Sequence, residues 1–596
     1  MNHGLIISLL FVSVATVTIH AQVAGADSAA CNAQFAESLV EQQVAESKSM
    51  VEPVKRIKIL IRSAEFLWKL DQPQARIYFA EAWKMADDRF KEFGFEEKNV
   101  ADERVTVSLP DQRMEVIRAI AKHDAEWAKK LSEQMLADLE KAKGEKKPFD
   151  DGREEGELLS LAAESSKTNP EFSRYLFRRV MKRPLTSHWF FTFHRLAGGD
   201  KSFADSIYVE TLRNYRNESP RRLLYLSAYP FANERIFGYE KFNLGMSRPD
   251  NMQSSPALER QFLETFFARI AAFAASEEEM NRPAEKYGQP EAVYMTAALR
   301  EIEPSVIQRH PDLLYRFGVA QSQAVSLLND AMRKSLDTND KRNSDLGGSF
   351  QDRLDAVKKA ESEGKLTDWM IVQLVTWNKR TEAQFAEIEP FLDKVKEEKP
   401  RRDLINFFWF LRAKLAVDEK RWEDAEKFGQ KVPEIEHRVL IMFDIAAIQA
   451  KGDQDTAALF ETLNRVSKLA RTLDNSVAKA QILLGTANMY EKVNHSIALD
   501  ELAESIRVTN TLKDPDIFTS HVSRRIIGKH FTSMSSFSTP GYDLEKTFQD
   551  LSKKDFDMSL AHARSLGDKY FRTLAVIAVA NNCAKNAPPK PRVKKL

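Results

Sequence analysis

The sequence predicts an all-α fold, an α-solenoid of stacked antiparallel helical hairpins arranged in two halves. Three observations predict it. Glycine and proline are scarce, at 21 and 22 of 596 residues, which favours helix over sheet. Hydrophobic residues make up 43% and include 37 phenylalanines, which is ample material for a core. A basic residue followed eight positions later by alanine recurs in five segments of helical period.

The first hairpin shows how the spacing predicts paired helices. Apolar residues at i, i+3, i+4, i+7 and i+11 mark one face of a helix: Ile57, Leu60, Ile61, Ala64 and Trp68. A turn follows at 69–73, and Pro73 suits the start of the return helix because its missing N–H would be unpaired there anyway. The sequence therefore predicts two antiparallel helices over 54–90.

Small alanines at matched positions predict where paired helices approach closely. The predicted packing alanines are Ala64, Ala75, Ala121, Ala446, Ala457, Ala487, Ala498 and Ala580. Hairpins at 438–463 and 479–506 are offset by 41 residues, so Ala446 corresponds to Ala487 and Ala457 to Ala498. Acidic residues that follow repeat helices are expected to cap turns: Asp71, Asp124 and Asp453.

Small residues at two hairpin positions with a large aromatic between them, over roughly 54–215 and 400–580, resemble tetratricopeptide-like α-solenoid repeats. The 34-residue period and the full Trp-Leu-Gly-Tyr pattern are absent. The resemblance therefore implies a TPR-like superhelix and no particular partner. The chain is also similar in type to uncharacterised exported bacterial helical-repeat proteins, a similarity that implies no activity.

Residues 1–26 read as a signal peptide. The apolar stretch 4–19 is followed by small residues, with cleavage expected after Ala26 or after Ala21. The start Met1-Asn2-His3 has no Lys or Arg, and an uncleaved membrane anchor is the alternative. The sequence predicts an exported protein, periplasmic or extracellular, that contacts a membrane only if this segment is not removed.

The two cysteines, Cys31 and Cys583, stand near opposite ends of the mature chain. A disulfide needs Cα atoms within about 7 Å, whereas the ends of an open solenoid lie far apart. Two separate thiols are therefore expected.

Breaks in the helical period predict the domain organisation. An N-terminal helical-hairpin domain is expected at 32–334, a polar linker at 335–352, a C-terminal helical-repeat domain at 353–584 and a disordered basic tail at 585–596. A further irregular piece at 532–542 reads as a surface loop.

The irregular loop 229–256 is the candidate ligand or partner site, because long loops on solenoids often bind. Its aromatics would stack on a ligand and its arginines would pair an anion: Tyr229, Phe231, Arg235, Phe237, Tyr239, Phe242 and Arg248. The alternative is that the aromatics pin the loop to the protein.

No catalytic, metal-binding or nucleotide-binding motif is present in the sequence, and no cofactor is expected. The histidines His188 and His194 are six apart and more consistent with an apolar segment than with a metal site. The Glu154-Glu155 run reads as a solvated face. Glu164-Ser165 resembles the acid motif of exported superhelical lytic transglycosylases, but the Gly-Leu-Met-Gln signature that should follow is absent.

Charge and architecture together favour a non-enzymatic scaffold that binds a protein or peptide. Lys plus Arg number 88 against 87 Asp plus Glu, which disfavours a nucleic-acid partner. The alternative is an α/α-toroid glycan hydrolase or lyase, which a closed ring with two carboxyl groups about 5–10 Å apart would favour. A surface nutrient-binding protein would instead expose an aromatic platform at 229–242.

Overall fold

The structure is a computed structural model that describes residues 31–94, 97–100, 105–142, 153–233, 236–238, 252–281, 289–347, 350–376, 381–450, 456–518, 521–539 and 541–585. This part of the chain contains 27 α-helices and two two-stranded antiparallel sheets, so the predicted all-α class is confirmed. The predicted signal peptide lies outside the described residues, as does nearly all of the predicted basic tail.

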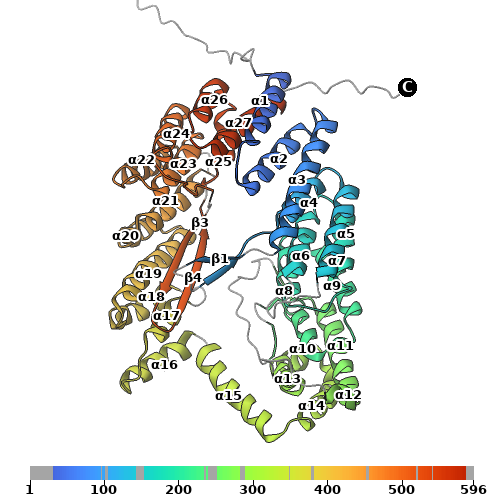
Figure 1. Ribbon diagram of the computed structural model, residues 1–596. Coiled ribbons are helices and arrows are strands. Elements are labelled where there is room, and N and C mark those ends of the chain that lie inside the picture. Colours follow the sequence, from blue (N-terminus) through green and yellow to red (C-terminus); the bar gives the residue numbers. More distant parts are fainter. Residues whose placement is uncertain are drawn as a thin grey trace, which may run out of the picture.

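The helices form two arms that a bridge joins at one end, while the first and last described helices meet at the other (Figure 1). We call this closed circuit the frame. The N-terminal arm contains α1 (Ala33–Ser47), α2 (Pro53–Leu67), α3 (Gln72–Phe93), β1 (Glu97–Val100), β2 (Val105–Ser108), α4 (Gln112–Ala121), α5 (Ala125–Ala142), α6 (Arg153–Ser165), α7 (Pro170–Val180), α8 (His188–Gly199), α9 (Lys201–Asn214), α10 (Pro220–Leu223), η2 (Leu224–Leu226), α11 (Pro256–Ala274), α12 (Glu277–Met280), α13 (Glu291–Arg309), η3 (Pro311–Leu313) and α14 (Leu314–Ser326).

The bridge consists of α15 (Asp330–Gly347) and α16 (Phe350–Ser362). The C-terminal arm contains α17 (Asp368–Thr376), α18 (Glu382–Ile388), η4 (Glu389–Lys394), α19 (Glu398–Asp418), α20 (Trp422–Gln430), α21 (Ile435–Gln449), α22 (Thr456–Arg471), α23 (Val477–Tyr490), α24 (His495–Thr509), β3 (His521–Ile527), β4 (Thr532–Ser538), α25 (Leu544–Leu551), α26 (Phe556–Arg564) and α27 (Lys569–Lys585).

Helices that follow each other in sequence pack as pairs, including α2 with α3, α6 with α7 and α23 with α24. Seven of the eight predicted packing alanines are buried: Ala64, Ala75, Ala121, Ala446, Ala487, Ala498 and Ala580. The predicted caps Asp71 and Asp124 are also confirmed, because their carboxylates accept from the backbone N–H groups of Gln74 and Trp127. Asp453 lies outside the described residues.

The prediction for Ala457 is wrong, because this side chain is exposed. The buried face of α22 begins at Leu459 and continues through Leu463 and Val466, and a residue two positions before Leu459 points to the opposite side of the helix. The connection before α22 spans 450–455, whereas the connection before α24 spans 491–494. These two extra residues shift the second helix of the repeat relative to the 41-residue offset.

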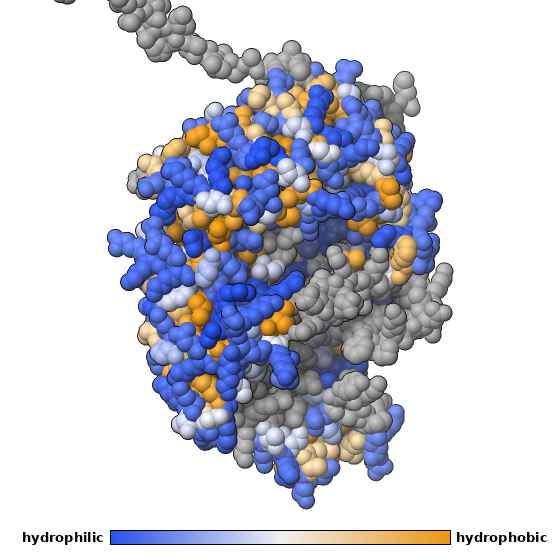
Figure 2. All heavy atoms as spheres, turned by 60° about the vertical axis from the view of Figure 1, so that its left-hand side comes forward, coloured by the Kyte–Doolittle hydropathy of each residue, from blue (hydrophilic) through white to orange (hydrophobic). Residues whose placement is uncertain are grey.

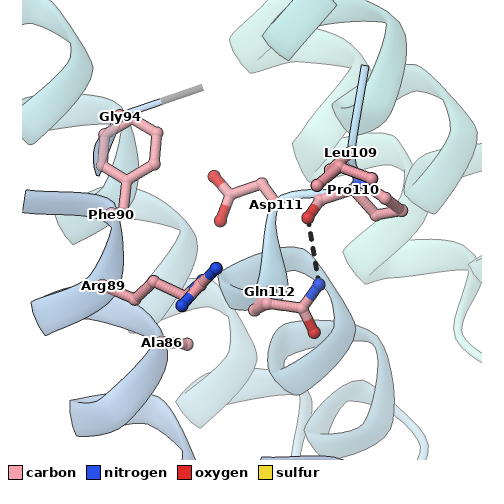
Figure 3. A pocket seen from close by; sticks show the side chains of 8 residues that line it. All are labelled: Ala86, Arg89, Phe90, Gly94, Leu109, Pro110, Asp111 and Gln112. Atoms are coloured by element: carbon pink, nitrogen blue, oxygen red, sulfur yellow. Dashed lines mark hydrogen bonds between the residues drawn. The ribbon is translucent and has the colours of Figure 1, made fainter. Parts of the chain in front are cut away.

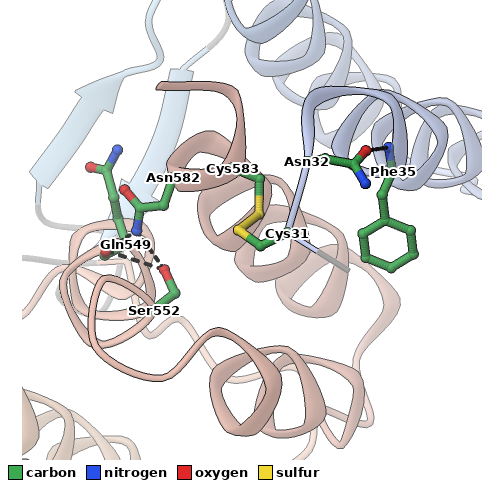
Figure 4. The surroundings of a disulfide bond; sticks show 7 residues. All are labelled: Cys31, Asn32, Phe35, Gln549, Ser552, Asn582 and Cys583. Carbon is green, nitrogen blue, oxygen red and sulfur yellow. Dashed lines mark hydrogen bonds between the residues drawn. A yellow bond between two sulfur atoms is a disulfide. The ribbon is translucent and has the colours of Figure 1, made fainter. Parts of the chain in front are cut away.

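The two ends of the chain meet, and the prediction of two separate thiols is wrong. Helix α1 packs against α27, and Cys31 is disulfide-bonded to Cys583 with the Cα atoms 5.0 Å apart (Figure 4). Beside this bond, the amide of Asn582 donates to the hydroxyl of Ser552. The expectation failed because it assumed an open row of hairpins, whereas the frame returns to its start.

The described residues of the predicted linker, 335–347 and 350–352, are helical and not irregular. Helix α15 continues to Gly347, the first residue of the glycine pair, and α16 starts at Phe350. The segment contains no proline to break the helix, and Leu336 is fully buried. The polar composition of this segment was therefore not sufficient to predict a flexible linker.

The hydrophobic core divides within the C-terminal half of the chain. One cluster of buried side chains joins residues 36–336 to residues 439–583, and a second is built from residues between 354 and 445 with Val522 and Ile526 of β3. The helices near the disulfide thus share one continuous core with the N-terminal arm.

Two β hairpins lie in the space between the arms in the view of Figure 1. Strands β1 and β2 pair antiparallel, as do β3 and β4. The prediction of a surface loop at 532–542 is wrong, because residues 532–538 form strand β4. Its serine-rich composition hid the alternation of exposed and half-buried residues that marks a strand.

The face with the C-terminal arm forward is mainly hydrophilic, and its hydrophobic side chains are scattered in small areas (Figure 2). Among the described residues, none of the helices combines the length and apolar character that a bilayer crossing requires.

We expect the Cys31→Ser/Cys583→Ser variant to be less stable than the wild type. The bond closes a loop of 552 residues, and the chain-entropy model gives a stabilisation of about 6 kcal/mol for a loop so long. Urea unfolding with and without reductant measures the effect. Reductant should lower the wild-type midpoint and leave the variant unchanged; an insensitive wild type would contradict the expectation.

Ala487→Glu should destabilise the protein by about 3 kcal/mol or more, because it buries an unpaired carboxylate at a fully buried position of α23. Ala457→Glu is the matched control at an exposed position of the neighbouring repeat, and we expect a change within about 0.5 kcal/mol. Thermal unfolding of both variants gives the comparison. Equal losses would show that the assignment of buried and exposed faces is wrong.

Candidate functional site

The β3–β4 hairpin is the most distinctive feature of the inner side of the C-terminal arm (Figure 1). Its turn is closed by Gly528, whose N–H donates to the carbonyl oxygen of Phe531 at 3.0 Å. Residues along β4 alternate between exposed and half-buried, as expected for a strand with one face on a core. The hairpin therefore has an anchored face and a solvent face.

Aromatic contacts anchor the hairpin to α19 and α17. The ring of Phe537 lies 4.8 Å from Phe410, between ring centroids, and Phe531 lies 5.4 Å from Trp369. At the tip, the backbone N–H of Lys529 donates to the carboxylate of Glu397, with distances of 3.1 and 3.2 Å to its two oxygens. These contacts hold the ribbon rigidly on the arm.

Arg524 occupies the middle of the anchored face and is only 3% exposed. Its Nη2 donates to the hydroxyls of Ser535 and Ser533 at 2.7 and 3.2 Å, and the guanidinium lies 3.8 Å from the ring centroid of Phe407. Burial lowers the pKa of Arg524 to about 10. Within the described residues, its Nε and Nη1 have no hydrogen-bond partner, an unusual state for a buried cation.

Asp403, which is close to Arg524, and the neighbouring Glu434 have pKa values moved in opposite directions. Burial raises the pKa of Asp403 on α19, and the charge of Glu434 raises it further. The imidazole of His437 lowers the pKa of Glu434, whose Oε2 lies 2.7 Å from its Nδ1. Such a split between neighbouring acids is one arrangement that acid–base chemistry uses.

The described aromatics of the predicted ligand loop are packed into the protein. Tyr229 and Phe237 are buried, the hydroxyl of Tyr229 donates to Asp205 at 2.6 Å, and Phe231 packs edge-on against Phe237 with centroids 5.1 Å apart. Tyr229 also lies 5.2 Å from Tyr208, centroid to centroid. These three rings pin the loop to the arm and do not form an exposed platform, because they fill the space beside the helices.

The other predicted residues of this loop lie outside the described residues: Arg235, Tyr239, Phe242 and Arg248. The structure therefore leaves their proposed role as a prediction.

A small pocket opens where the β1–β2 hairpin joins α3 and α4 (Figure 3). Its lining residues are Ala86, Arg89, Phe90, Gly94, Leu109, Pro110, Asp111 and Gln112. The carboxylate of Asp111 binds the fully buried Arg113, with Nη2 to Oδ2 at 2.7 Å, and that guanidinium lies on the ring of Phe90. This ion pair stabilises the junction between the β1–β2 hairpin and α4. Asp111 carries the one carboxylate among the lining residues, and that carboxylate is already paired with Arg113.

Glu155 was expected on a solvated face, but it is 3% exposed on α6. The hydroxyl of Thr186 donates to its Oε1 at 2.9 Å, and burial raises its pKa to about 7. The sequence of the Glu154-Glu155 pair does not show which side chain is buried, because burial depends on where the neighbouring helices pack.

The weaker sequence candidates have structural roles. Both ring nitrogens of His194 lie against backbone carbonyl oxygens, 3.0 Å from Phe190 and 3.1 Å from Asn233. Glu164 is exposed and pairs with Arg118 at 2.6 Å. In the part of the chain that the structure describes, no group of three or more His, Cys, Asp or Glu side chains is placed to hold a metal ion.

No protein-family model matches the chain, and no curated protein matches it either.

We expect Glu155→Gln to stabilise the protein at pH 8 but not at pH 5. The carboxyl has a higher pKa in the folded state than its ordinary 4.5, so its favourable contribution is complete below that value and is lost as pH rises through about 7. The gain at pH 8 should reach about 3 kcal/mol at most. Urea unfolding at both pH values measures it, and an equal difference at the two would contradict the assignment.

Proposed function

We propose that the protein is an exported α-solenoid scaffold that binds a protein or peptide partner outside the cytoplasm, without catalysis of its own. The observation that carries the proposal is the closed frame of paired helices with β hairpins on its inner side (Figure 1). The tetratricopeptide-like arrangement of the helix pairs is part of this proposal.

The disulfide supports the export part of the proposal. Disulfides persist in oxidising compartments and are rare in the cytosol. Cys31 stands five residues after the expected cleavage site at Ala26, so the mature chain would begin shortly before its covalent link to α27. The apolar stretch at residues 4–19 is consistent with the same route.

The rigidity of the frame supports the scaffold part of the proposal. Binding costs less when the receptor surface is ordered in advance, and α1, α27 and the bonded hairpin tip at Lys529 fix the inner side.

The alternative function, a glycan hydrolase or lyase, gains from two observations. The chain closes on itself as an α/α toroid would, and the pKa values of Asp403 and Glu434 are split. On that reading, Asp403 is the acid and Glu434 the charged partner. Asp403→Asn and Glu434→Gln would then each remove glycan cleavage while leaving the fold intact.

A pull-down from an envelope extract, with the mature chain as bait, tests the scaffold against the enzyme. We expect one partner in stoichiometric amount, whose Kd with the purified chain is then measured by calorimetry. The Cys31→Ser/Cys583→Ser bait is the control and should bind more weakly under the same conditions, because its frame can open. Release of sugar from peptidoglycan or polysaccharide by the wild type, lost in Asp403→Asn, would favour the enzyme.

A further inference from the structure

The backbone of β4 presents a free edge on the inner hairpin. Gly528 and Phe531 form a hydrogen-bonded pair, and such pairs alternate along an antiparallel ladder. With the observed register, Ser533, Ser535 and Phe537 therefore bond to β3. The N–H and C=O groups of the intervening residues point away from β3: Thr532, Met534, Ser536 and Ser538.

Among the residues that the structure describes, none of these outward groups forms a backbone–backbone hydrogen bond outside the hairpin. The four residues are themselves exposed. The backbone of β3 lies against α19 and α21, whereas β4 reaches α19 through the ring of Phe537 on the opposite face. The free edge is thus on the side away from the arm, over a length of seven residues.

Edge strands are normally protected by charged side chains, proline or bulges. Strand β4 has none of these within 532–538, and its solvent face carries small hydroxyls with one larger apolar side chain, Met534, which is 45% exposed. A rigid, unprotected edge of this kind is a template for an added strand. Because the aromatic contacts to α19 fix the hairpin, the template is ordered before a partner arrives.

Charge specifies the partner further. Residues 521–538 contain no Asp or Glu, and they include two histidines. Their exposed cations are Arg525 and Lys529, whereas Arg524 is buried on the anchored face. Arg525 is exposed and pairs with Met534 in the register, so its charge lies on the same face as the exposed β4 side chains. Glu397 is at the tip, where its carboxylate already accepts from the Lys529 N–H. Asp403 is close to the buried Arg524 and to Glu434 on the anchored side.

We propose that β4 binds an extended, acidic peptide segment of the partner by strand addition, with backbone hydrogen bonds along its free edge. This inference rests on the scaffold function and names the chemistry of its ligand. The outward N–H and C=O groups extend over the seven residues of β4. A bound peptide strand of about seven residues would therefore pair with all of them.

Fluorescence anisotropy with a labelled eight-residue Glu-Val repeat peptide tests the proposal on the full mature chain. We expect saturable binding that weakens at least tenfold when lysine replaces glutamate. A peptide N-methylated at every residue cannot donate to an edge and should not bind. No binding of the unmodified peptide, or equal binding of the methylated one, would overturn strand addition.

Ser536→Pro and Ser536→Ala form a matched pair on the protein side. Proline removes one outward N–H without touching the ladder to β3, whereas alanine removes only the hydroxyl. We expect at least a tenfold loss of affinity for Ser536→Pro and a change within twofold for Ser536→Ala, with circular dichroism showing both folded. Equal affinities would overturn the proposal.

The same variants separate this inference from the scaffold function. If the Ser536→Pro chain still captures the envelope partner with unchanged Kd, strand addition is overturned while the scaffold stands. If the wild type captures no partner but binds the acidic peptide through a methylation-sensitive contact, the edge stands and the scaffold function fails.

Discussion

The packing of α1 against α27, made covalent by the Cys31–Cys583 bond, is the contact on which the rest of the frame depends. A row of helical hairpins has an apolar face at each end that needs a cap. Here each end covers the other, and α27 is buried almost all round, from Leu574 to Ala580. In an open solenoid, a terminal helix as apolar as α27 would expose one of its hydrophobic faces to water. Closure of the frame buries that face.

Closure also explains the unequal division of the core. The helices next to the disulfide merge into one cluster with the N-terminal arm, while the second cluster contains the lower part of the C-terminal arm and β3. The polar bridge α15 buries little beyond Leu336 in its described part. Since the frame is already closed at the α1–α27 contact, this bridge spans the arms without supplying a large hydrophobic interface.

The sequence predicted what local spacing determines. Helix pairs, buried alanines such as Ala64 and Ala487, and the Asp71 cap follow from periods of a few residues, which a single chain displays directly. Ala457 was misassigned because two inserted residues change the register of α22, and β4 was missed because serines obscure its alternation.

Contacts between residues far apart in the sequence could not be predicted from local spacing. The pairing of Cys31 with Cys583 depends on how every hairpin between them turns, so no local pattern contains it. The candidate site was misplaced for the same reason. The aromatic residues of loop 229–256 suggested a ligand site in the sequence, but Tyr229 and Phe237 are buried in the core. Arg524 looked ordinary in sequence, and only the fold of the hairpin over Phe407 buries it.

A closed frame restricts what its inner side can bind. A folded domain has to fit between arms whose separation is fixed by the bridge and the disulfide, whereas an extended chain needs only the width of one strand. The inner hairpin provides backbone groups, small side chains and positive charge in place of an apolar patch. Such a surface gains little from burying hydrophobic area, so its affinity must come from a row of hydrogen bonds and from charge. Extended acidic peptides supply both, and for this reason the β4 edge and the ring closure support the same kind of partner.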